Sequence, residues 1–189
     1  MLEIIDQWDK NLFLLLNGIH APWLDPIMAY GTEQLTWIPL YLLFIYFIYK
    51  VEGNKWVYII LLIAFTILLT DQFSASLMKP MIGRLRPCYS ESLEGLVHLV
   101  GRCGGKYGFI SSHAANTFGV ASFLFFLLRG RLHYIGWIFL WSALVSYTRI
   151  YLGVHYPLDV FFGALSGIII GYLVYRLYLL YKLQIQPRP

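Results

Sequence analysis

Long apolar runs dominate this chain, and polar residues interrupt them at only a few places. A helix that crosses a bilayer needs about 20 predominantly apolar residues. We expect crossings near residues 27–49, 56–78, 113–128, 132–152 and 157–181, the third of which is short unless it begins in the polar residues before it. The one long polar loop covers residues 79–110. The pattern therefore predicts an all-α, polytopic membrane helical bundle with five to six membrane helices.

The first 20 residues are patterned differently, as an amphipathic helix. Apolar residues recur there at helical spacing: Ile5, Trp8, Leu12, Leu15, Leu16 and Ile19. The acids and the lysine among the first ten residues would be costly at the centre of a bilayer. We interpret residues 1–20 as a helix in the membrane interface; the alternative is a short first span paired with its neighbours. Together with the loop and a tail at 183–189, the segments form one domain over residues 1–189.

Composition supports a membrane protein. The chain is 59% hydrophobic, whereas a soluble domain is usually about 45–50% apolar. The formal net charge of +4 suits anionic lipid head groups but identifies no ligand. We expect membrane lipids and a lipid substrate as partners and no nucleic acid; the sequence does not indicate an oligomeric state.

Charge in the short loops indicates the orientation. Basic residues in short loops mark the cytoplasmic side, and three such places share one side if five helices cross: Lys50 and Lys55, Arg129 and Arg131, and Lys182 with Arg188. The other side is at least as basic, which agrees with the rule only if its cations belong to a site. The loop 79–110 is then extracytoplasmic. Cys88 and Cys103 bracket that loop, and an oxidising compartment allows them to form a disulfide; the alternative is two unrelated thiols.

Three short motifs gather charge in a chain that is only 13% charged. The first, KPMIGRLRP from Lys79 to Pro87, places Lys79 and Arg86 at the outer end of the second span. Arginine matches pairs of phosphate oxygens and lysine adds a point charge. Pro80 and Pro87 argue against a continuous helix there, so the segment is able to fold back over a site. The alternative is snorkelling of these side chains at the interface, which suits Arg84 better than Arg86.

The second motif, Ser111-Ser112-His113, stands at the start of the third span. A helix N-terminus presents free backbone N–H groups and the positive end of the helix dipole, both of which favour an anion. Ser111 either donates to that anion or caps the helix. His113 lies in the first turn, where it is placed to protonate a departing oxygen, although a lone histidine at an interface is more often structural.

The third motif, RIYLGVHYPLD, contains Arg149, His155 and Asp159. Pro157 suits the first turn of a helix, so Asp159 should lie in that turn and His155 just before it. A carboxylate four residues on can hold one imidazole nitrogen protonated and leave the other free as a nucleophile. The alternative is a buried pair with no chemistry. Two histidines and an aspartate also form a plausible metal-ligand set, but three neighbouring cations favour an anion, so we expect no metal and no cofactor.

With these motifs in order, the chain resembles the type 2 phosphatidic acid phosphatase superfamily of integral membrane lipid phosphatases. Its pattern is Lys, six residues, Arg-Pro; then Pro-Ser-Gly-His; then Ser-Arg, five residues, His, three residues, Asp. Three departures occur: Ile110 replaces proline, Ser112 replaces glycine and Thr148 replaces serine. They put the backbone geometry in doubt, because Ser112 cannot approach a phosphate as closely as glycine does.

The resemblance implies a role for each matched residue. His155 would attack phosphorus to form a phosphohistidine, Asp159 would orient it, and His113 would protonate the leaving group. The phosphoryl oxygens would be held by Lys79, Arg86, Ser111, Ser112 and Arg149. Asp71, outside the motifs, is expected to pair with a motif cation or to face the mouth of the site.

These features predict a membrane phosphatase of the bacterial inner membrane, with its site facing the periplasm or outside. Undecaprenyl diphosphate and phosphatidylglycerol phosphate are the leading substrate candidates, ahead of phosphatidate and phosphorylated lipid A. Three alternatives stay open: a lipid phosphotransferase, a non-catalytic lipid-binding or transport protein of the same fold, and a vanadate-dependent oxidase. The oxidase is the least favoured, because this sequence does not predict the soluble helical scaffold that it would need.

Overall fold

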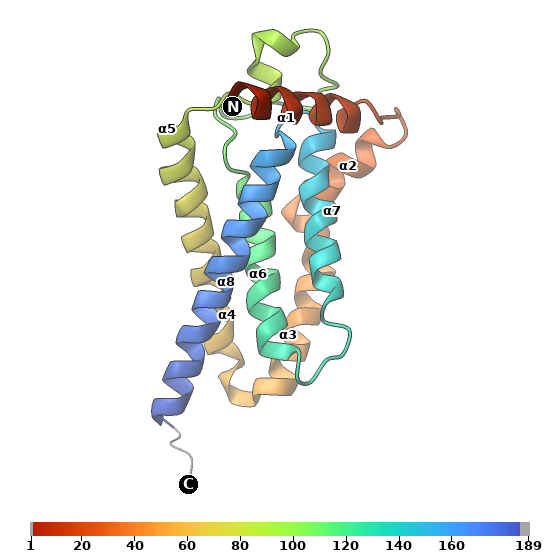
Figure 1. Ribbon diagram of the computed structural model, residues 1–189. Helices are drawn as coiled ribbons and strands as arrows, with labels where there is room; N and C mark the ends of the chain where they lie inside the picture. The colour runs from red at the N-terminus through yellow and green to blue at the C-terminus, as the bar shows by residue number, and fades with distance from the viewer. Residues whose placement is uncertain (1, 186–189) are drawn as a thin grey trace.

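The computed structural model describes residues 2–185 of the 189-residue chain and contains helices and loops, with no strand in that range (Figure 1). The prediction of an all-α fold is confirmed. The α-helices are α1 (Leu2–Asn17), α2 (Asp25–Thr32), α3 (Ile38–Glu52), α4 (Trp56–Asp71), α5 (Lys79–Ile82), α6 (Ser112–Leu128), α7 (Trp137–Tyr151) and α8 (Pro157–Ile185). The last residues of the predicted tail, 186–189, lie outside the described residues.

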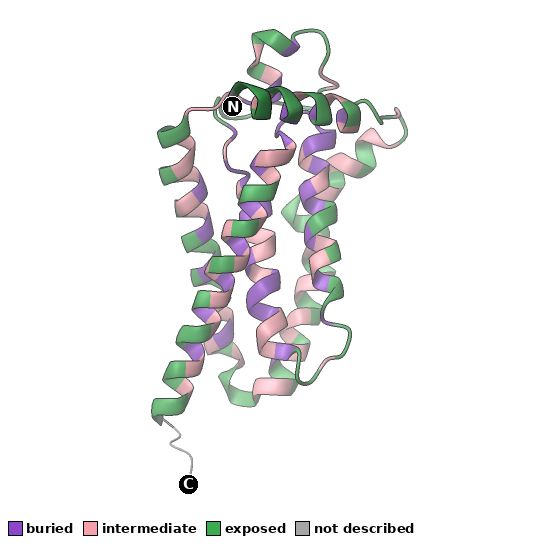
Figure 2. Ribbon diagram, in the orientation of Figure 1, coloured by how far each residue is buried: buried purple, intermediate pink, exposed green. Residues whose placement is uncertain are grey.

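Helix α6 is the centre of the bundle, where it packs against α8, α7 and α4. Its buried residues include Ala114, Ala115, Gly119 and Ala121, and Figure 2 shows burial concentrated along it. Small residues at such a position let two helix backbones approach closely. The main apolar core is completed by Phe123, Leu124 and Leu128 from the same helix and by residues of its neighbours.

Two helical stretches are long and apolar enough to cross a membrane: Gln34–Ile82, which includes both α3 and α4, and Pro157–Gln184. Helix α6 is a shorter apolar helix. The expected span at 27–49 is interrupted, because α2 ends at Thr32 and a 3₁₀ turn covers Gln34–Trp37 before α3 begins. Charged Glu33 lies in extended backbone at this break.

Helix α1 lies across one end of the bundle, over the ends of the long helices (Figure 1). Its inner face buries Phe13 and Asn17, while Trp8 and Leu15 are exposed on the outer face. Asn17 donates to the carbonyl oxygens of Ile150 and Tyr151 at 3.1 and 2.8 Å. These bonds fasten α1 to the end of α7, within the third motif.

The helix that carries Lys79 does not end at Pro80, contrary to the prediction. A π-helical stretch, Gln72–Met78, joins α4 to α5, and Pro80 falls in the first turn of α5. Proline is tolerated in a first turn, and the wider π turn separates it from the α-helical ladder behind. The chain instead turns at Gly83, whose φ of 66° is in the left-handed region that glycine adopts freely.

Beyond Gly83 the chain forms the long loop, which includes two 3₁₀ turns, Pro87–Tyr89 and Glu91–Leu93. Its two ends are paired: Arg86 N–H donates to Lys106 O at 3.2 Å, and Gly108 N–H donates to Arg84 O at 2.9 Å. The predicted disulfide between Cys88 and Cys103 is present, with Cα atoms 6.1 Å apart. The loop is therefore tied across its base rather than free.

We expect the double substitution Cys88→Ser/Cys103→Ser to lower the free energy of unfolding by about 3 kcal/mol, since the disulfide restricts the unfolded chain. Thermal unfolding in detergent measures this change. A reductant should destabilise the native protein by a similar amount and leave the double variant unaffected. An unfolding curve of the native protein that does not respond to reductant would contradict the prediction.

Candidate active site

The histidine–aspartate pair of the third motif lies where α7 ends and α8 begins. His155 Nδ1 is 3.3 Å from Asp159 Oδ2, and the same oxygen accepts the backbone N–H of Tyr156 at 3.0 Å. Both side chains are almost completely buried. The end of the long loop packs closely against the pair. A Cβ on Gly108 would lie 2.9 Å from Asp159 Oδ2, so there is room only for glycine at this position. The arrangement leaves Nε2 as the imidazole nitrogen that is free to react.

Burial decides the charge of His155. Loss of solvent lowers the pKa of this imidazole to about 4, and the lowering outweighs the opposing effect of Asp159. The charges of Arg86 and Arg149 act in the same direction as burial. At neutral pH the imidazole is therefore uncharged, as a nitrogen nucleophile must be.

The second motif begins α6 beside this pair. Ser111 caps the helix, its Oγ accepting the N–H of Ala114 at 3.5 Å, and its own N–H donates to the backbone oxygen of Asp159 at 2.9 Å. A Cβ on Gly163 would lie 2.6 Å from Ser111 O. The start of α6 is thus held directly against α8. His113 follows in the first turn of α6, within electrostatic range of Arg149, His155, Lys79 and Arg86.

Ser112, the departure from the family pattern, takes part in the polar contacts of the site. Its Oγ accepts Lys79 Nζ at 2.7 Å and is 2.9 Å from Ser74 Oγ. The contact with Lys79 joins the first motif to the second. A serine at this position therefore orients the lysine through its hydroxyl.

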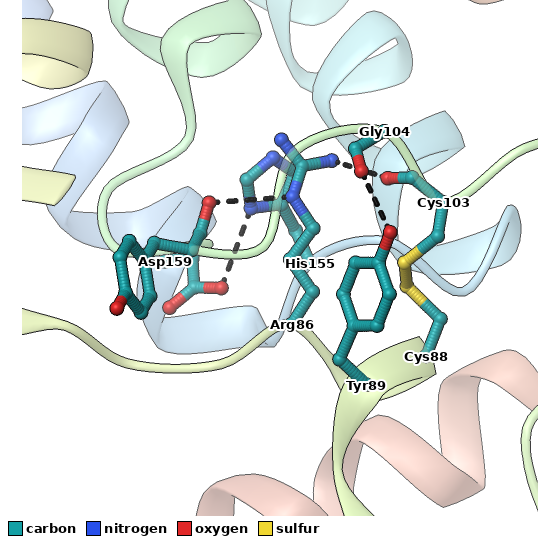
Figure 3. The surroundings of a disulfide bond; sticks show 8 residues. Arg86, Cys88, Tyr89, Cys103, Gly104, His155 and Asp159 are labelled. Atoms are coloured by element: carbon teal, nitrogen blue, oxygen red, sulfur yellow. Dashed lines mark hydrogen bonds and ion pairs between the residues drawn. A yellow bond between two sulfur atoms is a disulfide. The ribbon is translucent and has the colours of Figure 1, made fainter.

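Arg86 and Arg149 bring two guanidinium groups to the same region. Arg86 donates to Cys103 O at 2.9 Å and to Tyr107 O at 3.3 Å, so the disulfide loop holds its side chain. Figure 3 shows Arg86, the disulfide and the His155–Asp159 pair together. Arg149 donates to Thr32 Oγ1 at 2.7 Å, while its buried Nε has no partner among residues 2–185. A buried unpaired donor is costly, which suits an anion as its partner.

A cavity of about 430 Å³ opens beside the second motif. Its polar end includes Asp71, Ser112, His113 and Asn116. Asp71 was expected either to pair with a motif cation or to face the mouth of the site, and it faces this cavity. The rest of its wall is mostly apolar and comes from the 3₁₀ turn Gln34–Trp37 and from α3, α4, α6 and α7: Trp37, Tyr41, Phe44, Ile45, Ile48, Ile60, Ile63, Ile67, Val120, Leu124, Trp141 and Val145. From His113 to Leu124 the helix rises about 16 Å, roughly half the thickness of a hydrocarbon core.

Arg84 is the residue that sequence reasoning placed wrongly. It does not snorkel at the interface: its guanidinium pairs with Asp6, Asp9 and Asp159 at 2.9, 2.7 and 3.1 Å. Asp9, which carried no site prediction, is 3% exposed. The position of Arg84 inside the first motif was a signal for the arginine, but no local pattern pointed to Asp9.

The fold and the site together define a class of protein, a membrane-embedded enzyme of phosphoryl transfer. A buried neutral imidazole beside a carboxylate has the character of a nucleophile, and neighbouring cations have the charge to neutralise phosphoryl oxygens, which are the two things that this chemistry requires. The cavity lies within the bundle and is lined mainly by apolar side chains. Comparisons with known proteins refine this class.

Residues 56–182 match the model of the PAP2 superfamily. The chain is 42% identical to the lipid A 4'-phosphatase of Bacteroides thetaiotaomicron, covering 93% of this chain and 79% of that one. It is 37% identical to the lipid A 4'-phosphatase of Porphyromonas gingivalis, covering 94% and 76%. The solved transmembrane PAP2-type phosphatidylglycerolphosphate phosphatase of Bacillus subtilis shares the fold, with a TM-score of 0.66, 20% identity and coverage of 98% and 90%.

The chain belongs to the PAP2 superfamily, and the resemblance seen in its three motifs is confirmed. It is an integral membrane enzyme that hydrolyses lipid phosphates. The role of each residue and the identity of the lipid are the subject of the proposal that follows.

Proposed function

We propose that this protein is a lipid A phosphatase that removes the 4'-phosphate. The observation that carries the proposal is its similarity, over more than nine tenths of its length, to two proteins from different organisms that are both lipid A 4'-phosphatases. The leading candidates from sequence, undecaprenyl diphosphate and phosphatidylglycerol phosphate, rank below lipid A on this observation.

In the proposed reaction, His155 Nε2 attacks phosphorus and the bond from phosphorus to the lipid oxygen breaks. His113 gives its proton to that oxygen, which leaves as the lipid alcohol. A water then attacks the phosphohistidine, His113 takes a proton from it, and the phosphorus–nitrogen bond breaks to release inorganic phosphate. Asp159 holds His155 through Nδ1 at 3.3 Å throughout.

The cations and the helix N-terminus hold the phosphoryl group in this scheme. Arg149 offers its unpaired Nε, Lys79 reaches the site through Ser112, and Arg86 is fixed by the disulfide loop. The backbone N–H groups of Ser112 and His113 lie in the first turn of α6, where a helix favours an anion. Positioning and charge neutralisation are most of what phosphoryl transfer asks of a protein.

The size and apolar lining of the cavity support a lipid as the substrate. Its polar end meets the catalytic histidine His113, and its apolar wall reaches about one leaflet into the bundle. We propose that a single acyl chain occupies it while the phosphate meets the cations. The remaining chains of lipid A would stay in the surrounding bilayer.

The site is proposed to face the periplasm from the inner membrane. The α3–α4 and α6–α7 connections, which contain Lys55 and Arg129, lie at the opposite end of the bundle from the loop (Figure 1), and basic short loops favour the cytoplasm. The disulfide between Cys88 and Cys103 suits an oxidising compartment. Both observations support the same orientation.

Phosphate release by the purified protein tests the proposal. We expect release from lipid A, located at the 4' position by mass spectrometry of the product, at least tenfold faster than from undecaprenyl diphosphate, phosphatidylglycerol phosphate or phosphatidate. A chelator should not reduce the rate, because neutralisation of the phosphate is assigned to Lys79, Arg86 and Arg149. An added acceptor lipid that gains the phosphate would indicate the phosphotransferase instead. Preferential hydrolysis of another lipid in the panel would contradict the substrate assignment.

A further inference from the structure

The carboxylate of Asp159 has a second partner besides His155. Its Oδ2 faces His155 and the N–H of Tyr156, while its Oδ1 accepts Arg84 Nη1 at 3.1 Å. Asp159 is completely buried, so the orientation of the carboxylate depends on these few contacts. Arg84 therefore fixes the side of Asp159 that the histidine does not touch.

Arg84 is itself held by the N-terminal helix. Its Nη1 donates to Asp9 Oδ2 at 2.7 Å and its Nη2 to Asp6 Oδ1 at 2.9 Å. Its guanidinium carbon lies 4.0 Å from the ring centroid of Tyr156, a cation–π distance. These contacts direct the guanidinium to carboxylates, unlike those of Arg86 and Arg149, so Arg84 is not placed as a phosphate ligand.

Asp9 also holds the helix that carries Asp159. Its Oδ1 accepts the backbone N–H of Leu158, in the first turn of α8, at 2.9 Å. An acceptor at that N–H satisfies a donor that the helix itself cannot pair. Burial raises the pKa of Asp9, and the bonds from Leu158 and Arg84 act against that rise. One side chain of α1 thus contacts both Arg84 and the start of α8.

An aromatic contact reinforces the same connection. Phe13, completely buried on α1, packs edge-to-face on Tyr156 with ring centroids 5.4 Å apart. Tyr156 lies directly after the nucleophile and carries Arg84 on its ring. Helix α1 consequently meets the segment from His155 to Asp159 through the hydrogen bond of Asp9 and the ring of Phe13, and it meets Arg84 through the ion pairs of Asp6 and Asp9.

From these contacts we propose that Arg84 and Asp9 are positioning residues of the reaction. Arg84 orients the carboxylate of Asp159, and Asp9 holds both Arg84 and the N-terminus of α8. The N-terminal helix is then a working part of the catalytic apparatus. The inference rests on the proposed roles of His155 and Asp159, and it adds two residues that act through them without touching substrate.

The charges around the catalytic pair give the proposal a distinctive readout. Charged or titratable groups face the pair from every packed element: Asp6 and Asp9 from α1, Lys79 from α5, Arg84 and Arg86 from the loop, His113 from α6, Arg149 from α7, and Tyr156. Removing a cation makes protonation of the pair easier, whereas removing an anion makes it harder. Loss of Arg84 and loss of the Asp9 charge should therefore move the acidic limb of the pH–rate profile in opposite directions.

The test compares four full-length variants in detergent or proteoliposomes, assayed for phosphate release from lipid A. Arg84→Gln should lower kcat about 10- to 100-fold, the range typical of lost supporting contacts, with KM within about threefold of the native value. Its acidic limb should move to higher pH, and that of Asp9→Asn to lower pH. Arg84→Lys should restore part of kcat. Glu3→Gln, a charge removal at an exposed site on the same helix, is the control and should match the native protein.

Each outcome bears on the proposal separately from the function. An unchanged kcat and profile in Arg84→Gln would overturn it, and so would a rise in KM at constant kcat, which would make Arg84 a substrate ligand. If the acidic limbs of the pH–rate profiles of Arg84→Gln and Asp9→Asn did not move in opposite directions, the contacts of Arg84 and Asp9 would have a structural role only. If Arg84→Gln does not fold, Arg84→Lys and Asp9→Asn carry the same comparison. Failure of the proposed function would instead appear as native protein that releases no phosphate from lipid A, and failure of the proposed mechanism as full activity of a His155→Ala variant.

Discussion

Replacing His155 by alanine is expected to lower the rate of phosphate release at least about 10³-fold, because the variant lacks the nucleophile while the cations still bind the substrate. The loss should fall on kcat, with KM changed little. Phosphate release from lipid A by purified protein measures it. His133→Ala is the matched control: His133 is an exposed histidine in the connection between α6 and α7, at the far end of the bundle.

A trapping experiment separates this role from a general loss of structure. Native protein mixed briefly with substrate labelled at phosphorus should retain label after alkaline denaturation and lose it in acid, since a phosphorus–nitrogen bond is acid-labile. His155→Ala should retain none, and His133→Ala should behave as the native protein does. Label or full turnover in His155→Ala would show that another group attacks phosphorus and would remove the proposed mechanism.

The catalytic pair is the part of the site that local sequence predicts best. His155 and Asp159 are four residues apart, and Pro157 between them starts α8, so that Asp159 lies in its first turn and His155 two residues before it. Such short-range geometry follows from where the helix starts. The pairing of Cys88 with Cys103 was predicted for a related reason, since both bound one loop.

The contacts of Arg84 show why the rest was not predictable. Its partners Asp159 and Asp9 are each 75 residues away in the sequence, one after it and one before it. No periodicity connects residues at that separation. Its surroundings depend on how α1 packs over the end of the bundle, which is a feature of the tertiary structure that local sequence does not determine. From sequence, snorkelling at the interface was the simplest local interpretation of this arginine. In the structure it instead forms ion pairs with three carboxylates.

Helix continuity was misjudged for a different reason. Pro80 argued against a continuous helix, but the argument assumed a regular α-helix before it. The π stretch Gln72–Met78 changes the register there, and the turn comes at Gly83 instead. The interruption near Glu33 was missed because an averaged apolar pattern over 27–49 does not resolve one charged residue.

The close approach of α6 and α8 is what brings the second and third motifs together, and glycines on α8 permit it. A Cβ on Gly167 would overlap the backbone of α6 at Ala115 and at Gly119, and a Cβ on Gly163 would overlap Ser111. The N–H of Ser111 donates to Asp159 O across this same contact. The spacing of the two helices therefore sets the distance between the N-terminus of α6, which is proposed to bind phosphate, and the His155–Asp159 pair.

Gly167→Ala is accordingly expected to destabilise the protein, although alanine is the better helix former. Helix propensity alone favours alanine by about 1 kcal/mol, but a methyl group forced against backbone atoms costs about 3 kcal/mol, the upper end of the range for overpacking, because two rigid helices have to separate. We expect a net loss of about 2 kcal/mol in the free energy of unfolding and at least a tenfold loss of kcat. Thermal unfolding in detergent and phosphate release measure the two effects.

The control is Gly136→Ala, since a Cβ at Gly136, where α7 begins, would meet no atom within 4 Å. It should leave activity unchanged and alter stability only slightly. If Gly167→Ala proved as stable and as active as Gly136→Ala, α6 and α8 would have to adjust without cost, and their spacing would not determine the site. A stable but inactive Gly167→Ala would instead locate the effect in the geometry of the site, because a separation too small to unfold the bundle would already move Ser111 away from Asp159.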